Sequence, residues 1–133
     1  DHSYLIYDPG DSVNYFKFNS SNLSGQSLTS NNLSSLVEEF DESATLFNCS
    51  QSEQWTCGSN ALAVSPGKIL LYERNQKTIE NLIQNGGYTG YTPKEIINGN
   101  FNDNEKIVVS INGSELSRGR GGARCMTMPL VRG

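Results

Sequence analysis

The order strand, strand, helix, strand occurs twice along this sequence, and the repeat constrains the fold more than any other feature. Pro-Gly pairs at residues 9–10 and 66–67 each lie between two apolar runs, which is typical of a turn that joins two strands. The predicted strands occupy residues 4–7 and 13–18 in the first unit, and 61–64 and 68–72 in the second. We therefore expect two hairpins, each opening one repeat unit.

A helical pattern follows each predicted hairpin. Apolar side chains recur with the spacing of one helix face, first at positions 33, 36, 37 and 40, and then at 79, 82 and 83. Asn31 or Asn32 is the expected cap of the first helix, while Asn75 and the run at 85–87 mark the ends of the second. Further strands are expected at residues 44–48, 106–111 and 124–131.

Two polar stretches interrupt the repeat. Residues 19–30 are rich in Asn, Ser and Gly, which predicts a mobile insertion. Residues 88–105 predict a polar loop, in which Thr92 and Pro93 open a short helical turn and the tip at 98–103 is poorly ordered.

The size and charge of the chain exclude several classes of protein. Its 133 residues fit one domain, and the net charge of −4 argues against a nucleic-acid or membrane partner. No apolar run is long enough to cross a bilayer, and no signal-peptide pattern is present, so we expect a cytoplasmic protein. The sequence begins with Asp rather than Met and leads directly into a predicted strand. We therefore expect residues 1–133 to be part of a longer protein.

Cys125 is the strongest candidate for chemistry. It follows two glycines, which let the backbone approach a ligand closely, and arginines stand at positions 118, 120 and 124. Nearby cations favour the nucleophilic thiolate, and an arginine can also bind a carboxylate with two hydrogen bonds. The competing interpretation is a buried cysteine that acts as a small hydrophobic side chain.

The other candidate residues favour simpler interpretations. An Arg-Gly-Gly run at 120–122 occurs in some RNA-binding segments, but here it is single and the net charge has the wrong sign. His2 lies at the frayed start of the chain and is interpreted as a surface residue. Trp55 is expected to serve packing, and Cys49 and Cys57 to be structural or incidental. The spacing of His, Cys and carboxylates fits no metal site.

Two segments carry a resemblance to a known family. Residues 114–130 (SELSRGRGGARCMTMPL) strongly resemble the carboxyl-terminal active-site segment of arginine deiminases. Residues 53–75 (EQWTCGSNALAVSPGKILLYERN) resemble the hairpin that precedes it in that family, and residues 78–86 resemble the following helix. The likeness extends from residue 53 to 132, except in the Asn-rich loop, and it is poor over residues 19–45.

The resemblance implies a fold and a reaction. Arginine deiminases belong to the guanidino-group-modifying superfamily, or penteins, whose fold is a five-bladed α/β propeller of ββαβ units. Residues 1–133 would then be the carboxyl-terminal part of one catalytic domain, with two blades and a strand that closes another. The family hydrolyses L-arginine to L-citrulline and ammonia without a cofactor. By this resemblance Cys125 is the nucleophile, while Arg120 and the backbone at Gly119 bind the substrate carboxylate.

The sequence also departs from the family pattern. The family uses a His-x-Asp pair, a further aspartate and a glutamate, and none of these motifs is present. We expect them upstream, in the remaining amino-terminal part of the same protein, so that the chain alone is inactive. Cys57 stands where many relatives carry an acidic residue. A methylarginine hydrolase, an amidinotransferase and a non-catalytic binding or structural module remain alternatives, and assembly into a homo-oligomer is left open.

Overall fold

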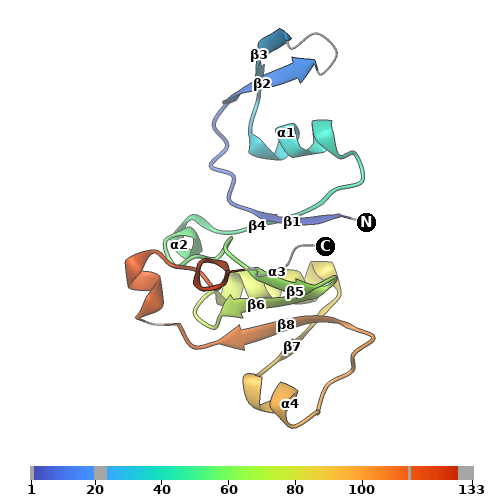
Figure 1. The fold of residues 1–133 in the computed structure, drawn as a ribbon, viewed down its shortest axis with the longest axis vertical. Coiled ribbons are helices and arrows are strands. Elements are labelled where there is room, and N and C mark those ends of the chain that lie inside the picture. The colour runs from blue at the N-terminus through green and yellow to red at the C-terminus, as the bar shows by residue number, and fades with distance from the viewer. Residues whose placement is uncertain (1, 20–23, 114, 129–133) are drawn as a thin grey trace.

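The computed structural model describes residues 2–19, 24–113 and 115–128, which form a mixed α/β arrangement with three small sheets (Figure 1). The strands are β1 (Ser3–Ile6), β2 (Val13–Asn19), β3 (Ser24–Ser30), β4 (Thr45–Asn48), β5 (Leu62–Ser65), β6 (Lys68–Tyr72), β7 (Tyr88–Tyr91) and β8 (Lys106–Ile111). The α-helices are α1 (Leu33–Phe40), α2 (Gln51–Gln54), α3 (Gln76–Gly86) and α4 (Pro93–Ile97). Two 3-10 helices, η1 (Leu116–Gly119) and η2 (Arg124–Met126), follow β8.

The second predicted unit is confirmed. Strands β5 and β6 form an antiparallel hairpin around Pro66 and Gly67, and α3 follows β6. The sheet continues with parallel pairing, in the order β5-β6-β8-β7. Ile107 and Val108 of β8 are both buried, as expected of a parallel strand covered on two faces.

The first predicted unit has the expected strands but not the expected pairing. The hairpin predicted between β1 and β2 is wrong, because β1 pairs in parallel with β4 while β2 pairs antiparallel with β3. Leu5 of β1 lies opposite Phe47 of β4, and both contact the core, so apolar burial selects this pairing. The predicted insertion at residues 19–30 is also wrong where it is described, since Ser24–Ser30 is a strand.

Both predicted helices of the repeat are present. Asn32, and not Asn31, caps α1 by accepting a hydrogen bond from the Ser35 backbone N–H at 2.8 Å. Helix α3 begins after Asn75 and ends at Gly87, which has a left-handed backbone. Helix α2 was not predicted, because its four residues carry no apolar periodicity.

The stretch from 88 to 105 contains more structure than its polarity suggests. It forms the edge strand β7 and then α4, whose capping box between Thr92 and Glu95 confirms the predicted helical turn. The tip contacts the rest of the fold, because Asp103 pairs with Lys68 at 2.6 Å and Phe101 lies edge-on to Tyr91.

The strand predicted over residues 124–131 is wrong at its start. Residues 124–126 form η2 instead, because the Cys125 N–H donates to the Gly122 carbonyl oxygen at 3.0 Å. The Thr127 N–H likewise donates to the Arg124 carbonyl oxygen at 3.1 Å, so these amides are paired within a turn and not along a sheet. Residues 129–131 lie outside the described part of the chain.

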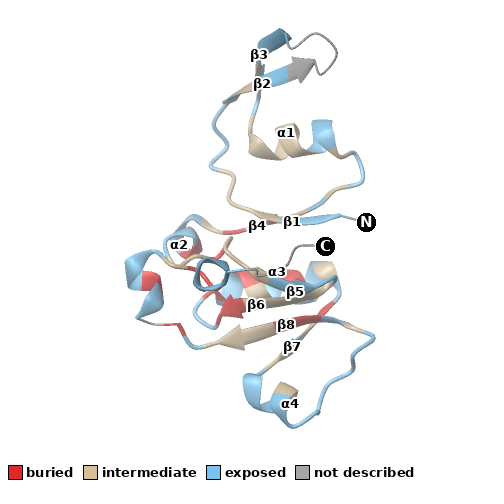
Figure 2. Ribbon diagram, viewed as in Figure 1, coloured by how far each residue is buried: buried red, intermediate tan, exposed pale blue. Residues whose placement is uncertain are grey.

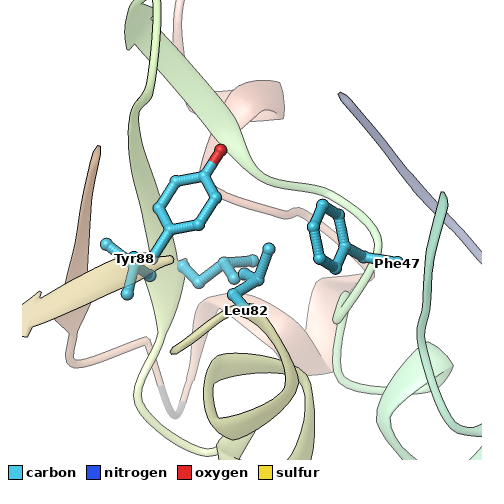
Figure 3. Close-up of a cluster of buried hydrophobic side chains, with 5 residues drawn as sticks. Phe47, Leu82 and Tyr88 are labelled. Atoms are coloured by element: carbon cyan, nitrogen blue, oxygen red, sulfur yellow. The ribbon is translucent and has the colours of Figure 1, made fainter. Parts of the chain in front are cut away.

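The hydrophobic core lies where the β1–β4 pair, α3 and the four-stranded sheet meet. Phe47, Leu82 and Tyr88 point toward one another there (Figure 3), together with Leu71 and Val108. Figure 2 shows buried residues around β4, α2, α3, β6 and β8, whereas the region of β2, β3 and α1 is intermediate or exposed in its described residues. The core therefore supports the elements that lead into residues 113–126.

Candidate active site

The segment from Gly113 to Met126 is fastened to the end of β6. The hydroxyl of Tyr72, which is almost fully buried, donates to the Gly121 carbonyl oxygen at 2.9 Å. The Nη1 atom of Arg74 donates a hydrogen bond to the Ser117 hydroxyl oxygen, 2.8 Å away. These contacts hold the cysteine-bearing loop against the four-stranded sheet.

Gly113 permits the close approach of this loop to Tyr72. A Cβ atom at residue 113 would lie 2.2 Å from Cδ1 of the Tyr72 ring, far inside van der Waals contact. The absence of a side chain is therefore a steric requirement for the position of the tyrosine.

Cys125 lies at the surface and accepts a hydrogen bond from Asn60. The Nδ2 atom of Asn60 is 3.1 Å from the Cys125 sulfur. Two hydrogen bonds, one from the Gly122 backbone and one from the Asn60 amide, lower the pKa of the Cys125 thiol. The positive charge of Arg124 lowers it further. The interpretation of Cys125 as a buried cysteine is thus wrong, and its surroundings favour the thiolate form.

Gly122 makes room for this asparagine. A Cβ atom at residue 122 would lie 2.2 Å from the Asn60 Cγ atom. The other amide atom of Asn60, Oδ1, is buried and has no hydrogen-bond partner among the residues that the structure describes. Among the described residues, the Cys125 sulfur is then the hydrogen-bond partner of this amide, and Asn60 is its donor.

Arg120 lies over the indole ring of Trp55. The guanidinium carbon is 4.3 Å from a ring centroid, a cation–π geometry, and the backbone of Arg120 is left-handed with φ 59°. No carboxylate of the described residues forms an ion pair with Arg120. Its fork is therefore available to an anionic ligand.

A pocket of about 250 Å³ lies beside Asn60 and Arg120. It is lined by Gln54, Trp55, Cys57, Ser59, Asn60 and Arg120. The structure thus brings Arg120 and, through Asn60, Cys125 to one place. Gly119, the other predicted substrate contact, ends η1 and is not among the residues that line this pocket.

Several pocket residues were missed from sequence. Trp55 was expected to serve packing, yet it is 60% exposed and its indole ring lies under the Arg120 guanidinium. Cys57 and Cys49 were both expected to be structural or incidental. Cys57 lines the pocket, whereas Cys49 is buried. The polar cluster from Gln54 to Asn60 was the available signal.

Residues far from the pocket match their simpler interpretations. His2 is exposed, with Nδ1 2.7 Å from an Asp41 carboxylate oxygen, which confirms it as a surface residue. Within residues 2–19, 24–113 and 115–128, no group of three His, Cys, Asp or Glu side chains is placed to hold a metal ion. No helix in these ranges has the length and apolar character needed to cross a membrane.

Comparison with known proteins identifies the family. Residues 42–132 match the sequence model of the family described as arginine deiminase. The chain belongs to the arginine deiminase family. Three similar relatives are arginine deiminases of Latilactobacillus sakei, 45% identical over 80 residues, Listeria monocytogenes serotype 4b, 43% identical over 83 residues, and Mycoplasma capricolum subsp. capricolum, 45% identical over 80 residues.

These arginine deiminases match only part of the chain and a small part of themselves. The matches cover 60–62% of this chain and 15–16% of each relative's length. The predicted family is confirmed, and the fold is mixed α/β. The five-bladed pentein propeller that arginine deiminase membership implies is not shown by the described residues and stays a prediction.

Proposed function

We propose that this chain supplies the nucleophile-bearing segment of a cytoplasmic enzyme that hydrolyses L-arginine to L-citrulline and ammonia. The observation that carries the proposal is a thiol of lowered pKa, Cys125, held by Asn60 beside a pocket that contains Arg120. Family membership supports the choice of a guanidinium substrate.

The residue types suit each part of that substrate. The Cys125 thiolate would attack the guanidinium carbon, ammonia would leave, and water would then cleave the carbon–sulfur bond to release citrulline. Arg120 would pair with the substrate carboxylate as a planar fork, with help from the backbone at Gly119. Asn60 would hold the sulfur in place through its amide.

The proposal needs groups that the described residues do not bring to the pocket. A histidine and carboxylates that orient the guanidinium and move protons would come from the remaining part of the same protein. Without them the thiolate cannot be aimed at the guanidinium carbon, so we expect the isolated chain to be inactive.

Citrulline formation by the complete protein tests this function. Cys125→Ala is expected to lower the rate by roughly a thousandfold or more, because the covalent route is lost. Cys49→Ala, at a buried cysteine that does not line the pocket, is the matched control and should retain turnover. Unchanged turnover in Cys125→Ala would remove Cys125 as the nucleophile.

A panel of substrates separates the related reactions. Consumption of methylated arginine in preference to arginine would make the protein a methylarginine hydrolase. Transfer to an acceptor such as glycine would make it an amidinotransferase. Absence of turnover on every substrate, with an intact thiol, would favour a binding or structural module.

A further inference from the structure

Cys57 and Cys125 both form a hydrogen bond with one residue, Asn60. The Asn60 backbone N–H donates to the Cys57 carbonyl oxygen at 3.0 Å, and its side-chain Nδ2 donates to the Cys125 sulfur at 3.1 Å. Cys57 also lines the pocket beside Asn60 and Arg120. Two thiols distant in sequence therefore share one small site.

The electrostatics of this site link the two sulfurs. Burial, and after it the negative charge of Cys125, raises the pKa of Cys57, while Arg120 opposes that rise. Burial, then Cys57 and Cys125, likewise raise the pKa of the Tyr72 hydroxyl.

The two cysteines differ in the way that a redox pair requires. Cys125 is exposed and favours the thiolate, which is the form that an oxidant attacks. Cys57 is half-buried and holds its proton more firmly, so it suits the role of a resolving thiol. The third cysteine, Cys49, is buried with its sulfur 3.5 Å from the Ser50 carbonyl oxygen.

We propose that Cys57 and Cys125 are a redox pair that a peroxide converts into a reversible disulfide, which masks the Cys125 sulfur. The Cys125 thiolate attacks one peroxide oxygen, the O–O bond breaks, and the sulfur is oxidised to a sulfenic acid. The other oxygen leaves as hydroxide, which takes a proton from the solvent to become water. Cys57 then gives up its proton, its sulfur attacks the Cys125 sulfur, and the S–O bond breaks to release a second water. Over both steps two thiols lose two electrons and one peroxide gains them.

The pairing concerns the thiols alone, so it stands or falls independently of arginine hydrolysis. The disulfide would block any reaction at Cys125, because a sulfur held in a disulfide cannot act as a nucleophile. A dithiol reductant would cleave the disulfide by thiol–disulfide exchange and restore both thiols.

Peptide mapping after peroxide treatment tests the proposal. The protein is treated with hydrogen peroxide, free thiols are alkylated, and the unreduced chain is cut after glutamate. Cleavage after Glu42, Glu53, Glu73 and Glu115 places Cys49, Cys57 and Cys125 in three separate peptides. We expect the peptides of residues 54–73 and 116–133 to be joined, residues 43–53 to be alkylated, and dithiothreitol to restore all three free thiols.

Two variants sharpen the test. In Cys57→Ser the disulfide should disappear and dimedone should trap the Cys125 sulfenic acid, whereas Cys49→Ser should still form the pair. Linkage of Cys49, linkage only between two protein molecules, or direct passage of Cys125 to sulfinic acid in the unaltered protein would overturn the proposal. A disulfide that forms in a protein without deiminase activity would support the redox pair and count only against the proposed function.

Discussion

A single amide hydrogen bond contributes to the reactivity of Cys125. Asn60 donates to the sulfur across 65 residues of sequence, and a donor to a thiolate favours the charged form. Gly122 leaves the space for that amide. The chemistry of the cysteine is therefore set partly by a neighbour on another segment of the chain.

Replacement of the Asn60 amide should slow the alkylation of the Cys125 thiol. In Asn60→Ala the pKa of Cys125 is expected to rise, because a hydrogen bond that lowers it is removed. Iodoacetamide alkylation of Cys125 near pH 7 should slow roughly three- to tenfold, the effect of one hydrogen bond, and the pH profile should move upward. Asn85→Ala, at an exposed position on α3, is the control. An unchanged pH profile in Asn60→Ala would remove Asn60 from this role.

At the scale of elements, a carboxylate from one helix caps the next. The buried Glu53 of α2 accepts hydrogen bonds from the backbone N–H groups of Lys77 and Thr78, each at 2.8 Å, and from the Thr78 hydroxyl at 2.7 Å. Asn75, the residue before α3, makes no side-chain cap. The first turn of α3 therefore depends on α2, and a negative charge there also suits the helix dipole.

Loss of this carboxylate should destabilise the fold. Glu53→Ala leaves buried N–H groups without acceptors and is expected to lower the free energy of unfolding by about 1–3 kcal/mol. Glu53→Gln, which keeps one acceptor oxygen, should cost less. Glu80→Ala changes an exposed residue of α3, the helix that Glu53 caps, and should alter stability by no more than about 0.5 kcal/mol. Urea denaturation followed by circular dichroism measures all three, and equal losses in Glu53→Ala and Glu80→Ala would contradict the cap.

A second carboxylate joins the end of α1 to β1 and gives a pH dependence. Hydrogen bonds from Ser43 and His2 lower the pKa of Asp41 from 3.8 to about 2. A lowered folded-state pKa stabilises the fold above the unfolded value, and this contribution is lost as pH falls from about 4 toward 2.

Thermal unfolding of Asp41→Asn tests that window. The variant should melt below the unaltered protein at pH 7, and the difference should shrink below pH 4 until it vanishes near pH 2. Ser43→Ala removes the hydrogen bond that lowers the pKa of Asp41 most, and it should reproduce part of the loss. A difference in melting temperature that is constant with pH would refute the ionic origin.

The elements that sequence predicts well are those with strong apolar patterns. Strands β5, β6 and β8 and helix α3 combine apolar runs with Gly, Pro or Asn at their ends, and each contributes to the core or packs against it. Strands β3 and β7 were missed because SGQSLTS and YTGY are polar or contain glycine. A strand that buries little needs only hydrogen-bond partners, which local composition does not reveal.

Candidate site residues could be proposed from sequence where they stand in one segment, but not where they depend on tertiary contact. Cys125 and Arg120 stand in a short motif, so residue chemistry and resemblance both pointed to them. Asn60, Trp55 and Cys57 reach the pocket only because the start of the β5–β6 hairpin lies beside the carboxyl-terminal loop. The spacing of residues in the sequence does not predict that these two segments lie side by side.

At the scale of the whole molecule, Phe47 joins two sheets into one core. It stands on β4, lies edge-on to Tyr88 at 6.5 Å between ring centroids, and is 4% exposed. Phe47→Ala is expected to lower the free energy of unfolding by about 3–5 kcal/mol, because a large cavity would form between the sheets. Ile97→Ala, at a residue 83% exposed, is the control and should be nearly neutral. A small loss in Phe47→Ala, measured by chemical denaturation, would mean that the β1–β4 pair does not share the core.

The contact between Gly113 and the Tyr72 ring has a consequence for anyone who alters this protein. Because position 113 has no room for even one methyl group, a change there would displace the ring, and the ring's hydroxyl holds the carbonyl oxygen of Gly121. A shift of Gly121 would move the loop that carries the Cys125 sulfur, although no pocket residue had been substituted. The position of the Cys125 sulfur thus depends on the absence of a side chain at residue 113.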